Sequence, residues 1–155
     1  MSERPCVLIV EARFYEDVAD SLVEGAAQVL EAAGFDHERL EVPGVFEIPG
    51  AIGMALRSME FHSEPIIYAG FLALGCVIRG DTSHYDYICG NSSRALMDLT
   101  TEFSVPLGFG VLTCEDMDQA KVRADPNRKN KGGEAALAAI EMVHVLKQLD
   151  TQLGG

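Results

Sequence analysis

The hydrophobic residues of this chain follow two patterns that alternate along the sequence. Short runs rich in aliphatic and β-branched residues predict strands at 6–10, 39–42, 66–78 and 105–113. Apolar residues spaced three and four apart predict amphipathic helices at 15–33, 49–59, 82–103, 116–122 and 133–149. Gly34 suits the end of the first helix, and Pro49 suits the first turn of the second.

These elements follow one another in the order β-α-β-α-β-α-β-α-α, with no internal repeat and no linker. Alternation of this kind predicts a parallel sheet covered by helices on both faces. We therefore expect one domain over 1–155 of the α/β class, a three-layer α/β/α sandwich with a four-stranded parallel sheet of the flavodoxin-like type. Gly70 and Gly75, inside the third strand, predict places where another part of the chain approaches closely.

The carboxyl ends of the strands gather the unusual segments of the chain, at 13–14, 43–48, 77–84 and 109–113. Ligands bind at this edge in sheets of this class. Pro43 and Pro49 restrict the backbone between them, so we expect 44–48 to be a stiff connection whose unpaired backbone groups could bind the edge of a heterocycle. Phe14 and Phe46 follow strands and could stack on a planar ligand, although each taken singly is more often a core residue.

The segment after the third strand combines a glycine turn with a helix start. Ser83 and Asp86 fit a capping box, which predicts that the helix begins near Thr82 or Ser83. Free backbone N–H groups at that end could bind an anion, and His84 beside them could transfer a proton near neutral pH. The alternative is an ordinary βα turn with an incidental histidine, and the pattern alone does not separate the two.

Composition narrows the function classes. The 155 residues are 48% hydrophobic and 23% charged, as in soluble globular proteins, and the net charge of −12 argues against nucleic-acid binding or a polybasic membrane anchor. No apolar run approaches the roughly 20 residues that a membrane span needs.

The four cysteines, Cys6, Cys76, Cys89 and Cys114, show neither a CxxC pair nor zinc-site spacing. We expect reduced, structural thiols in a cytoplasmic protein with no metal site.

Five of the twelve basic residues fall within 121–131, a local reversal of the overall charge that could hold an anion. Arg123 and Lys131 are the stronger candidates, since one closes a helix and the other opens the next, whereas a solvated loop is the favoured interpretation for Arg128 and Lys129. The chain has no GxGxxG, GxxxxGK[ST] or GxSxG motif, which argues against dinucleotide, nucleoside triphosphate and serine-hydrolase sites.

Four segments together resemble the 6,7-dimethyl-8-ribityllumazine synthase family: RF at 13–14, PGVFEIP at 43–49, LGCVIRGDTSHYDY at 74–87 and NKGGEAA at 130–136. The resemblance covers about 7–143. It implies a transferase-type condensing enzyme of riboflavin biosynthesis, acting without metal or organic cofactor. The substrates would be 5-amino-6-(ribitylamino)uracil and 3,4-dihydroxy-2-butanone 4-phosphate, joined through Schiff-base formation, phosphate elimination and ring closure.

The resemblance also implies roles for individual residues. His84 would transfer protons, and Arg123 would bind the phosphate with the backbone of Gly80, Asp81 and Thr82. Phe14 would stack on the pyrimidine. Its edge and its ribityl chain would contact Val45, Phe46, Glu47, Ile48, Cys76, Val77 and Ile78. Phe109 and Lys131 would close the far side from a neighbouring subunit of a homo-oligomer.

Two features depart from the family's pattern. Tyr15 stands where many members have asparagine. Segment 124–129 contains Pro126 where members that form sixty-subunit shells tend to carry a glycine-containing turn, so a pentamer is favoured over the shell.

Three alternatives stay open. The chain could be a non-catalytic paralogue that carries or senses a lumazine or flavin. It could be a flavodoxin-like phosphate-binding module that binds FMN as a monomer. It could also be a structural shell protein, which would need neither His84 nor Arg123.

Overall fold

The computed structural model describes residues 4–80 and 84–152. Within them, the strands are β1 (Cys6–Ala12), β2 (Asp36–Val42), β3 (Gly70–Ile78) and β4 (Leu107–Cys114). The α-helices are α1 (Glu16–Ala32), α2 (Ile48–Phe61), α3 (His84–Phe103), α4 (Met117–Ala124) and α5 (Lys131–Gln152). A single 3-10 turn, Val45–Glu47, precedes α2. None of these helices is long and apolar enough to span a membrane.

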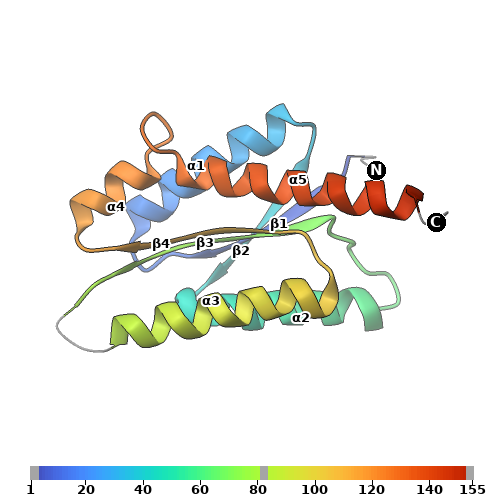
Figure 1. The fold of residues 1–155 in the computed structure, drawn as a ribbon, viewed down its shortest axis with the longest axis horizontal. Coiled ribbons are helices and arrows are strands. Elements are labelled where there is room, and N and C mark those ends of the chain that lie inside the picture. The colour runs from blue at the N-terminus through green and yellow to red at the C-terminus, as the bar shows by residue number, and fades with distance from the viewer. Residues whose placement is uncertain (1–3, 81–83, 153–155) are drawn as a thin grey trace.

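The strands form one sheet in the order β2-β1-β3-β4, and every pair is parallel. Helices α1, α4 and α5 cover one face and α2 and α3 cover the other (Figure 1). Alternate residues of β3 serve the two cores: Leu72 and Leu74 pack toward α1 and α5, whereas Phe71 and Ala73 pack toward α2 and α3. The predicted three-layer fold is therefore confirmed, and the order matches the flavodoxin-like type.

Strand pairing, rather than the apolar run, sets the limits of β3 and β2. The predicted strand at 66–78 begins too early, because Ile66 and Ile67 are 56% and 61% exposed and pairing with β1 starts only at Gly70. The predicted strand at 39–42 begins too late, because pairing with β1 extends back to Asp36. An apolar run without periodicity does not mark its own ends, and backbone pairing holds polar residues in an edge strand.

The connection predicted at 44–48 is helical from Val45 onward, where a 3-10 turn runs into α2. The Glu47 backbone N–H donates to the Gly44 carbonyl at 3.1 Å, and α2 begins directly at Ile48. Pro49 occupies the first turn of α2 as predicted, where its missing N–H breaks no helical bond. The segment lies tightly on β3, since a Cβ on Gly75 would come within 2.8 Å of the Val45 side chain. The close approach predicted at Gly75 is confirmed.

Glycines also bring α5 against β4 and α1. A Cβ on Gly108 of β4 would overlap the Ala135 carbonyl oxygen of α5, and one on Gly132 would overlap the Leu22 carbonyl oxygen of α1. Asn130, with φ of +46°, turns the chain into α5, and its side-chain oxygen accepts from the Gly133 backbone N–H at 3.2 Å. These contacts fix the first turn of α5, which carries Lys131.

Candidate active site

The first group of predicted site residues follows β1. Phe14 is 75% exposed, and its ring meets that of Tyr15 edge to face, with centroids 5.0 Å apart. Tyr15 itself packs against the core between the sheet and α1. Tyr15 therefore supports the exposed Phe14 ring from the inside, a role that its departure from the family's asparagine did not suggest.

A buried ion network anchors the turn that carries Phe14. Glu11, only 2% exposed, accepts two bonds from Arg39 at 2.8 and 2.7 Å and one from Arg13 at 2.9 Å. Arg13 also donates to Asp20 of α1. Burial alone would raise the pKa of the Glu11 carboxyl, but bonds from both guanidiniums outweigh it and hold that pKa below its ordinary value. Glu11 was not predicted. A lone carboxylate in an apolar strand, with arginines nearby in the sequence, was the available signal.

The predicted contacts at 45–48 and 76–78 divide by orientation. The side chains of Val45, Ile48 and Cys76 are buried, so the described chain offers a ligand mainly their backbone. Phe46 is 61% exposed and Glu47 is exposed, while Val77 and Ile78 are half-buried. Burial, reinforced by neighbouring Cys114, raises the pKa of the Cys76 thiol to about 12. That thiol stays neutral and is no nucleophile. All four cysteines are free thiols.

Arg79 joins the end of β4 to the first turn of α3, where His84 lies. Its backbone N–H donates to the Cys114 carbonyl at 2.9 Å, and its guanidinium bonds Glu115 at 3.1 Å. The same guanidinium lies 4.4 Å from the centre of the Tyr85 ring. His84 is exposed at the start of α3 as the structure describes it. Gly80 is exposed as well, whereas the predictions for Asp81, Thr82 and the Ser83 cap lie outside the described residues.

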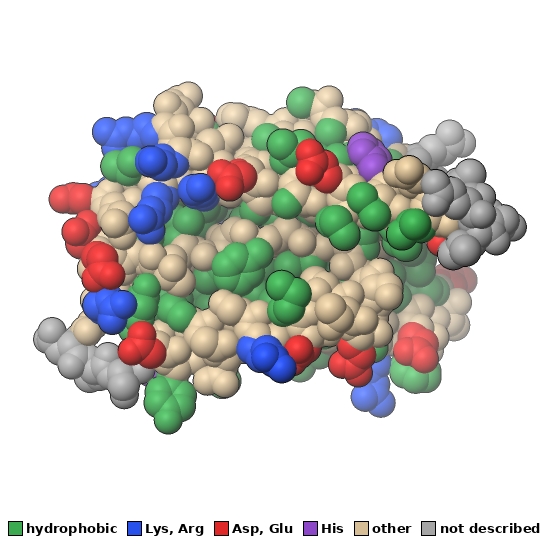
Figure 2. Space-filling model, in the orientation of Figure 1, with side chains coloured by type: hydrophobic (Ala, Val, Ile, Leu, Met, Phe, Trp, Pro, Cys, Tyr) green, Lys and Arg blue, Asp and Glu red, His purple; other side chains and the backbone are tan. Residues whose placement is uncertain are grey.

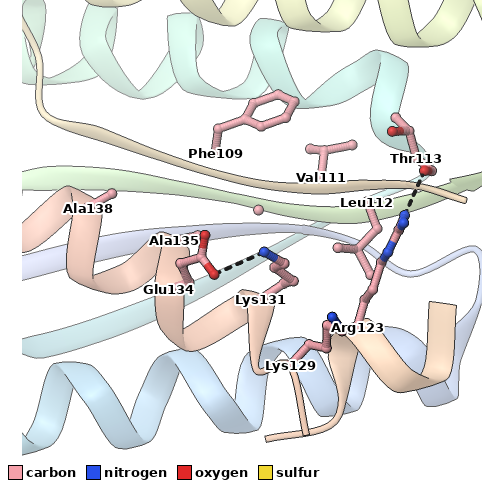
Figure 3. Close-up of a pocket in the computed structure, with 11 residues that line it drawn as sticks. Phe109, Val111, Leu112, Thr113, Arg123, Lys129, Lys131, Glu134, Ala135 and Ala138 are labelled. Carbon is pink, nitrogen blue, oxygen red and sulfur yellow. Dashed lines mark hydrogen bonds and ion pairs between the residues drawn. The ribbon is translucent and has the colours of Figure 1, made fainter. Parts of the chain in front are cut away.

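The second group lines a pocket of about 490 Å³ along the free edge of β4 (Figure 3). The lining residues are Phe109, Gly110, Val111, Leu112 and Thr113 of β4, Arg123 of α4, Lys129 of the connection, and Lys131, Glu134, Ala135 and Ala138 of α5. Arg123 donates to the Thr113 carbonyl at 3.1 Å, and the Lys131 ammonium lies 3.1 Å from the Glu134 carboxylate. Figure 3 shows the Phe109 ring on the opposite side of β4 from Arg123 and Lys131.

Basic side chains gather around this pocket. Figure 2 shows a group of them over α4 and the beginning of α5, beside acidic side chains at the outer end of α4. The pocket thus offers an anion a local positive field in a chain of net charge −12. Among residues 4–80 and 84–152, no three His, Cys, Asp or Glu side chains are placed to hold a metal ion.

The structure divides the predicted site residues into two sets. Phe109, Arg123 and Lys131 share the β4-edge pocket, whereas Phe14, Phe46 and His84 do not line it. The sequence grouped Arg123 with the 80–84 turn, and the described chain places its side chain with Phe109 and Lys131. Lys129 and Glu134 were missed. The spacing of Lys131 and Glu134, three apart at a helix start, could have indicated their ion pair.

Comparison with known proteins agrees with this chemistry. The family model described as 6,7-dimethyl-8-ribityllumazine synthase matches residues 5–147. A protein of that name from Agrobacterium fabrum is 50% identical over 94% of this chain and 97% of its own length. One from Rhodopseudomonas palustris strain BisA53 is 48% identical over 92% of this chain and 86% of its own, and one from Bartonella tribocorum is 46% identical over 96% and 94%.

Proposed function

Because the chain belongs to the 6,7-dimethyl-8-ribityllumazine synthase family, we propose that it performs the family's reaction where the β1 and β3 ends of one copy meet the β4-edge pocket of another. The chain is a riboflavin-biosynthesis enzyme. It condenses 5-amino-6-(ribitylamino)uracil with 3,4-dihydroxy-2-butanone 4-phosphate to give 6,7-dimethyl-8-ribityllumazine, phosphate and water. We infer in addition the roles of individual residues, a homo-oligomeric assembly and a cytoplasmic location.

The observation that carries these roles is that Arg123 and Lys131 meet on one side of β4 in this pocket, with the Phe109 ring on the other side of the same strand. Arg123 binds the phosphate of the butanone, and its bond to the Thr113 carbonyl holds the guanidinium at the pocket wall. The backbone N–H groups of Gly80, Asp81 and Thr82 of the other copy complete the phosphate site in this proposal.

The pyrimidine lies on Phe14, the exposed aromatic ring at the end of β1. Phe46 and the backbone of 45–48 and 76–78 contact its polar edge and its ribityl chain. Phe109, 46% exposed at the free edge of β4, closes the site from a second copy. A flat, polar heterocycle bound between aromatic rings is held in one plane, which places its amino group against the butanone carbonyl.

His84 transfers the protons. The 5-amino group attacks the carbonyl carbon and water leaves to form the Schiff base. Loss of a proton and of phosphate follows, and the ribitylamino nitrogen then closes the ring with loss of a second water. Holding both reactants together lowers the barrier by up to about 7–11 kcal/mol in ideal cases, and a positioned base adds about 10²–10⁴-fold. Most of the rate enhancement therefore does not depend on His84.

The assembly in this proposal is a homopentamer. Large apolar side chains on α5 face solvent in the single chain, among them Leu137, Met142 and Leu149, which are 50%, 48% and 49% exposed. Surfaces of this kind mark protein interfaces. Pro126 in the 124–129 connection supports the pentamer over the sixty-subunit shell. A particle of megadalton mass in analytical ultracentrifugation would contradict the pentamer.

The direct test follows lumazine fluorescence after the protein is mixed with both substrates, against the uncatalysed reaction. We expect His84→Ala to lower kcat by about 10²-fold while leaving condensation faster than background. Arg123→Ala should chiefly raise KM for the butanone phosphate. A wild-type protein that binds lumazine but does not accelerate its formation would instead be a carrier or sensor. Unchanged kinetics in both variants would refute the residue roles.

A further inference from the structure

We propose that Lys129 is a second phosphate-binding cation of the β4-edge pocket, which together with Arg123 matches the charge of a phosphate dianion. This inference rests on the proposed function, since the anion in question is the butanone phosphate or the phosphate released from it. Sequence alone favoured a solvated loop for both Arg128 and Lys129, and the structure separates these neighbours. Lys129 lines the pocket, whereas Arg128 is not among the lining residues.

The charges that line the pocket show why a second cation matters. Arg123, Lys129 and Lys131 bring three positive charges and Glu134 brings one negative charge. Lys131 is paired with Glu134 at 3.1 Å, so its charge is largely compensated before any ligand arrives. Arg123 donates to a neutral carbonyl and keeps its full charge. In the described part of the chain, the Lys129 ammonium has no ion pair or hydrogen bond, so the uncompensated cations of the lining are Arg123 and Lys129.

The backbone turns Lys129 toward the pocket. Its N–H donates to the Val122 carbonyl of α4 at 3.3 Å, and the Asn130 N–H donates to the Asp125 carbonyl at 3.0 Å. The Asp125 carboxylate also accepts from the Asn127 N–H at 2.8 Å, which closes the preceding turn. Segment 125–130 is therefore a hydrogen-bonded connection folded back onto the end of α4. Figure 3 shows Lys129 and Lys131 on the same side of β4 as Arg123.

A phosphate approaching this protein meets an overall charge of −12. Screening at physiological salt limits the reach of each charge to about 8 Å, so the cations of the pocket decide local attraction. A lysine ammonium serves as a movable point charge and does not need the fixed geometry of a guanidinium. Arg123 fixes the phosphate in place, and Lys129 supplies a second positive charge. The pocket then favours a phosphate dianion over a monoanion.

Lys129→Gln and Arg128→Gln form a matched pair. Each removes one positive charge from an exposed side chain in the same connection. At low ionic strength we expect Lys129→Gln to raise KM for the butanone phosphate, and the inhibition constant of inorganic phosphate, by about fivefold each. Arg128→Gln should change both by less than about twofold. Added salt should reduce the effect of Lys129→Gln on both constants. Lys129→Arg should keep both constants near their wild-type values. KM for the pyrimidine substrate should stay unchanged in all three variants.

Two results would overturn this inference. One is an equal rise of both constants in Lys129→Gln and Arg128→Gln, which would mean general charge rather than a site. The other is a rise of both substrates' KM in Lys129→Gln, which would mean that Lys129 supports the pocket as a whole and does not bind phosphate specifically. Calorimetric titration of the two variants with inorganic phosphate measures phosphate binding without turnover, and so tests Lys129 directly. A wild-type protein that makes no lumazine would refute the proposed function while leaving this titration to decide on Lys129.

Discussion

Glu11 is buried under the turn that carries Phe14, and it holds that turn through charge. Its carboxylate receives three bonds from Arg13 and Arg39, and Arg13 passes the connection on to Asp20 of α1. A buried carboxylate without its partners would be strongly unfavourable, and the same holds for the inward-facing guanidinium of Arg13 if the carboxylate is removed. The Glu11 carboxylate thus links the end of β1 to β2 through Arg39 and to the start of α1 through Arg13.

We expect Glu11→Gln to lower the free energy of unfolding by about 2–3 kcal/mol at pH 7. The folded-state pKa of Glu11 lies below the ordinary value of 4.5. Its contribution is therefore complete above that pH and is lost as the pH falls through the lower folded-state pKa. The difference between wild type and variant should shrink steadily below about pH 4.5. Urea unfolding of both proteins at fixed concentration, from pH 7 down to pH 3.5, measures this difference in unfolding free energy.

Glu41→Gln is the matched control. Glu41 pairs with Glu11 in the strand register but is exposed on the edge strand, and it has no ion pair among the described residues. Its substitution should change the unfolding free energy by less than about 0.5 kcal/mol. Equal losses in the two variants, or a Glu11→Gln loss that is independent of pH, would show that the buried carboxylate does not hold the turn.

Motifs supplied the candidate residues for chemistry but did not show what surrounds them. His84, Arg123 and Phe14 belong to short segments whose residue types fit proton transfer, anion binding and stacking. Glu134 and Lys129 become part of the pocket only because α4, the connection and α5 fold over the edge of β4. The same holds for Glu11, whose partner Arg39 is distant in sequence and adjacent in the sheet. Contacts of this kind depend on tertiary structure, so a local pattern can mark one residue but does not show which distant residues it meets.

At the scale of elements, strand β4 owes its pocket to its glycines. Gly108 and Gly110 leave room for α5 to lie directly on the strand, with the Ala135 backbone and side chain against them. This close packing brings the first turn of α5, with Lys131 and Glu134, to the edge where Phe109 projects. Hydrophobic periodicity predicted the order of the elements along the chain. It did not predict how closely α5 packs on β4, which depends on the absence of side chains at Gly108 and Gly110.

Gly108→Ala tests this packing. The new methyl group would overlap the Ala135 carbonyl oxygen and come within 2.7 Å of the Leu72 side chain, so α5 must shift. We expect the unfolding free energy to fall by about 2–3 kcal/mol. KM for the butanone phosphate should rise as well, since Lys131 moves with α5. Thermal unfolding and steady-state kinetics measure the two effects.

Gly53→Ala serves as the control because a Cβ there meets nothing within 4 Å of the chain. Alanine in the interior of α2 should be neutral or stabilise the fold by up to about 1 kcal/mol. A Gly108→Ala protein as stable and as active as Gly53→Ala would mean that α5 does not depend on the glycine contact.

At the scale of the whole molecule, each chain carries the predicted site residues at two separate places. Phe14 follows β1, Phe46 lies in η1 (Val45–Glu47) and His84 begins α3, whereas Arg123, Lys131 and Phe109 line the pocket at the free edge of β4. An edge strand with an exposed phenylalanine and a neighbouring apolar helix face is suited to contact with another chain. Sequence predicted this division only for Phe109 and Lys131, through the family resemblance, and it placed Arg123 with the 80–84 turn. No periodicity shows which residues of two copies meet.

If every site takes His84 from one copy and Arg123 from its neighbour, two impaired variants should complement each other. In oligomers assembled at random from equal amounts of His84→Ala and Arg123→Ala chains, about one quarter of the interfaces would combine an intact His84 with an intact Arg123. Co-expressed mixtures should therefore recover about one quarter of the wild-type rate at a butanone phosphate concentration far below the KM of Arg123→Ala, where either variant alone turns over little substrate.

Co-expression of His84→Ala with a chain that carries both substitutions is the control, because none of its interfaces then contains His84. Mixed oligomers are confirmed by capture through a tag on one chain and detection of the other. Recovery in the first mixture and not in the second requires that His84 and Arg123 reach the substrate from different chains. Mixed oligomers without recovery would place both residues at a site within one chain, and the pocket at the free edge of β4 would then need no second copy to work.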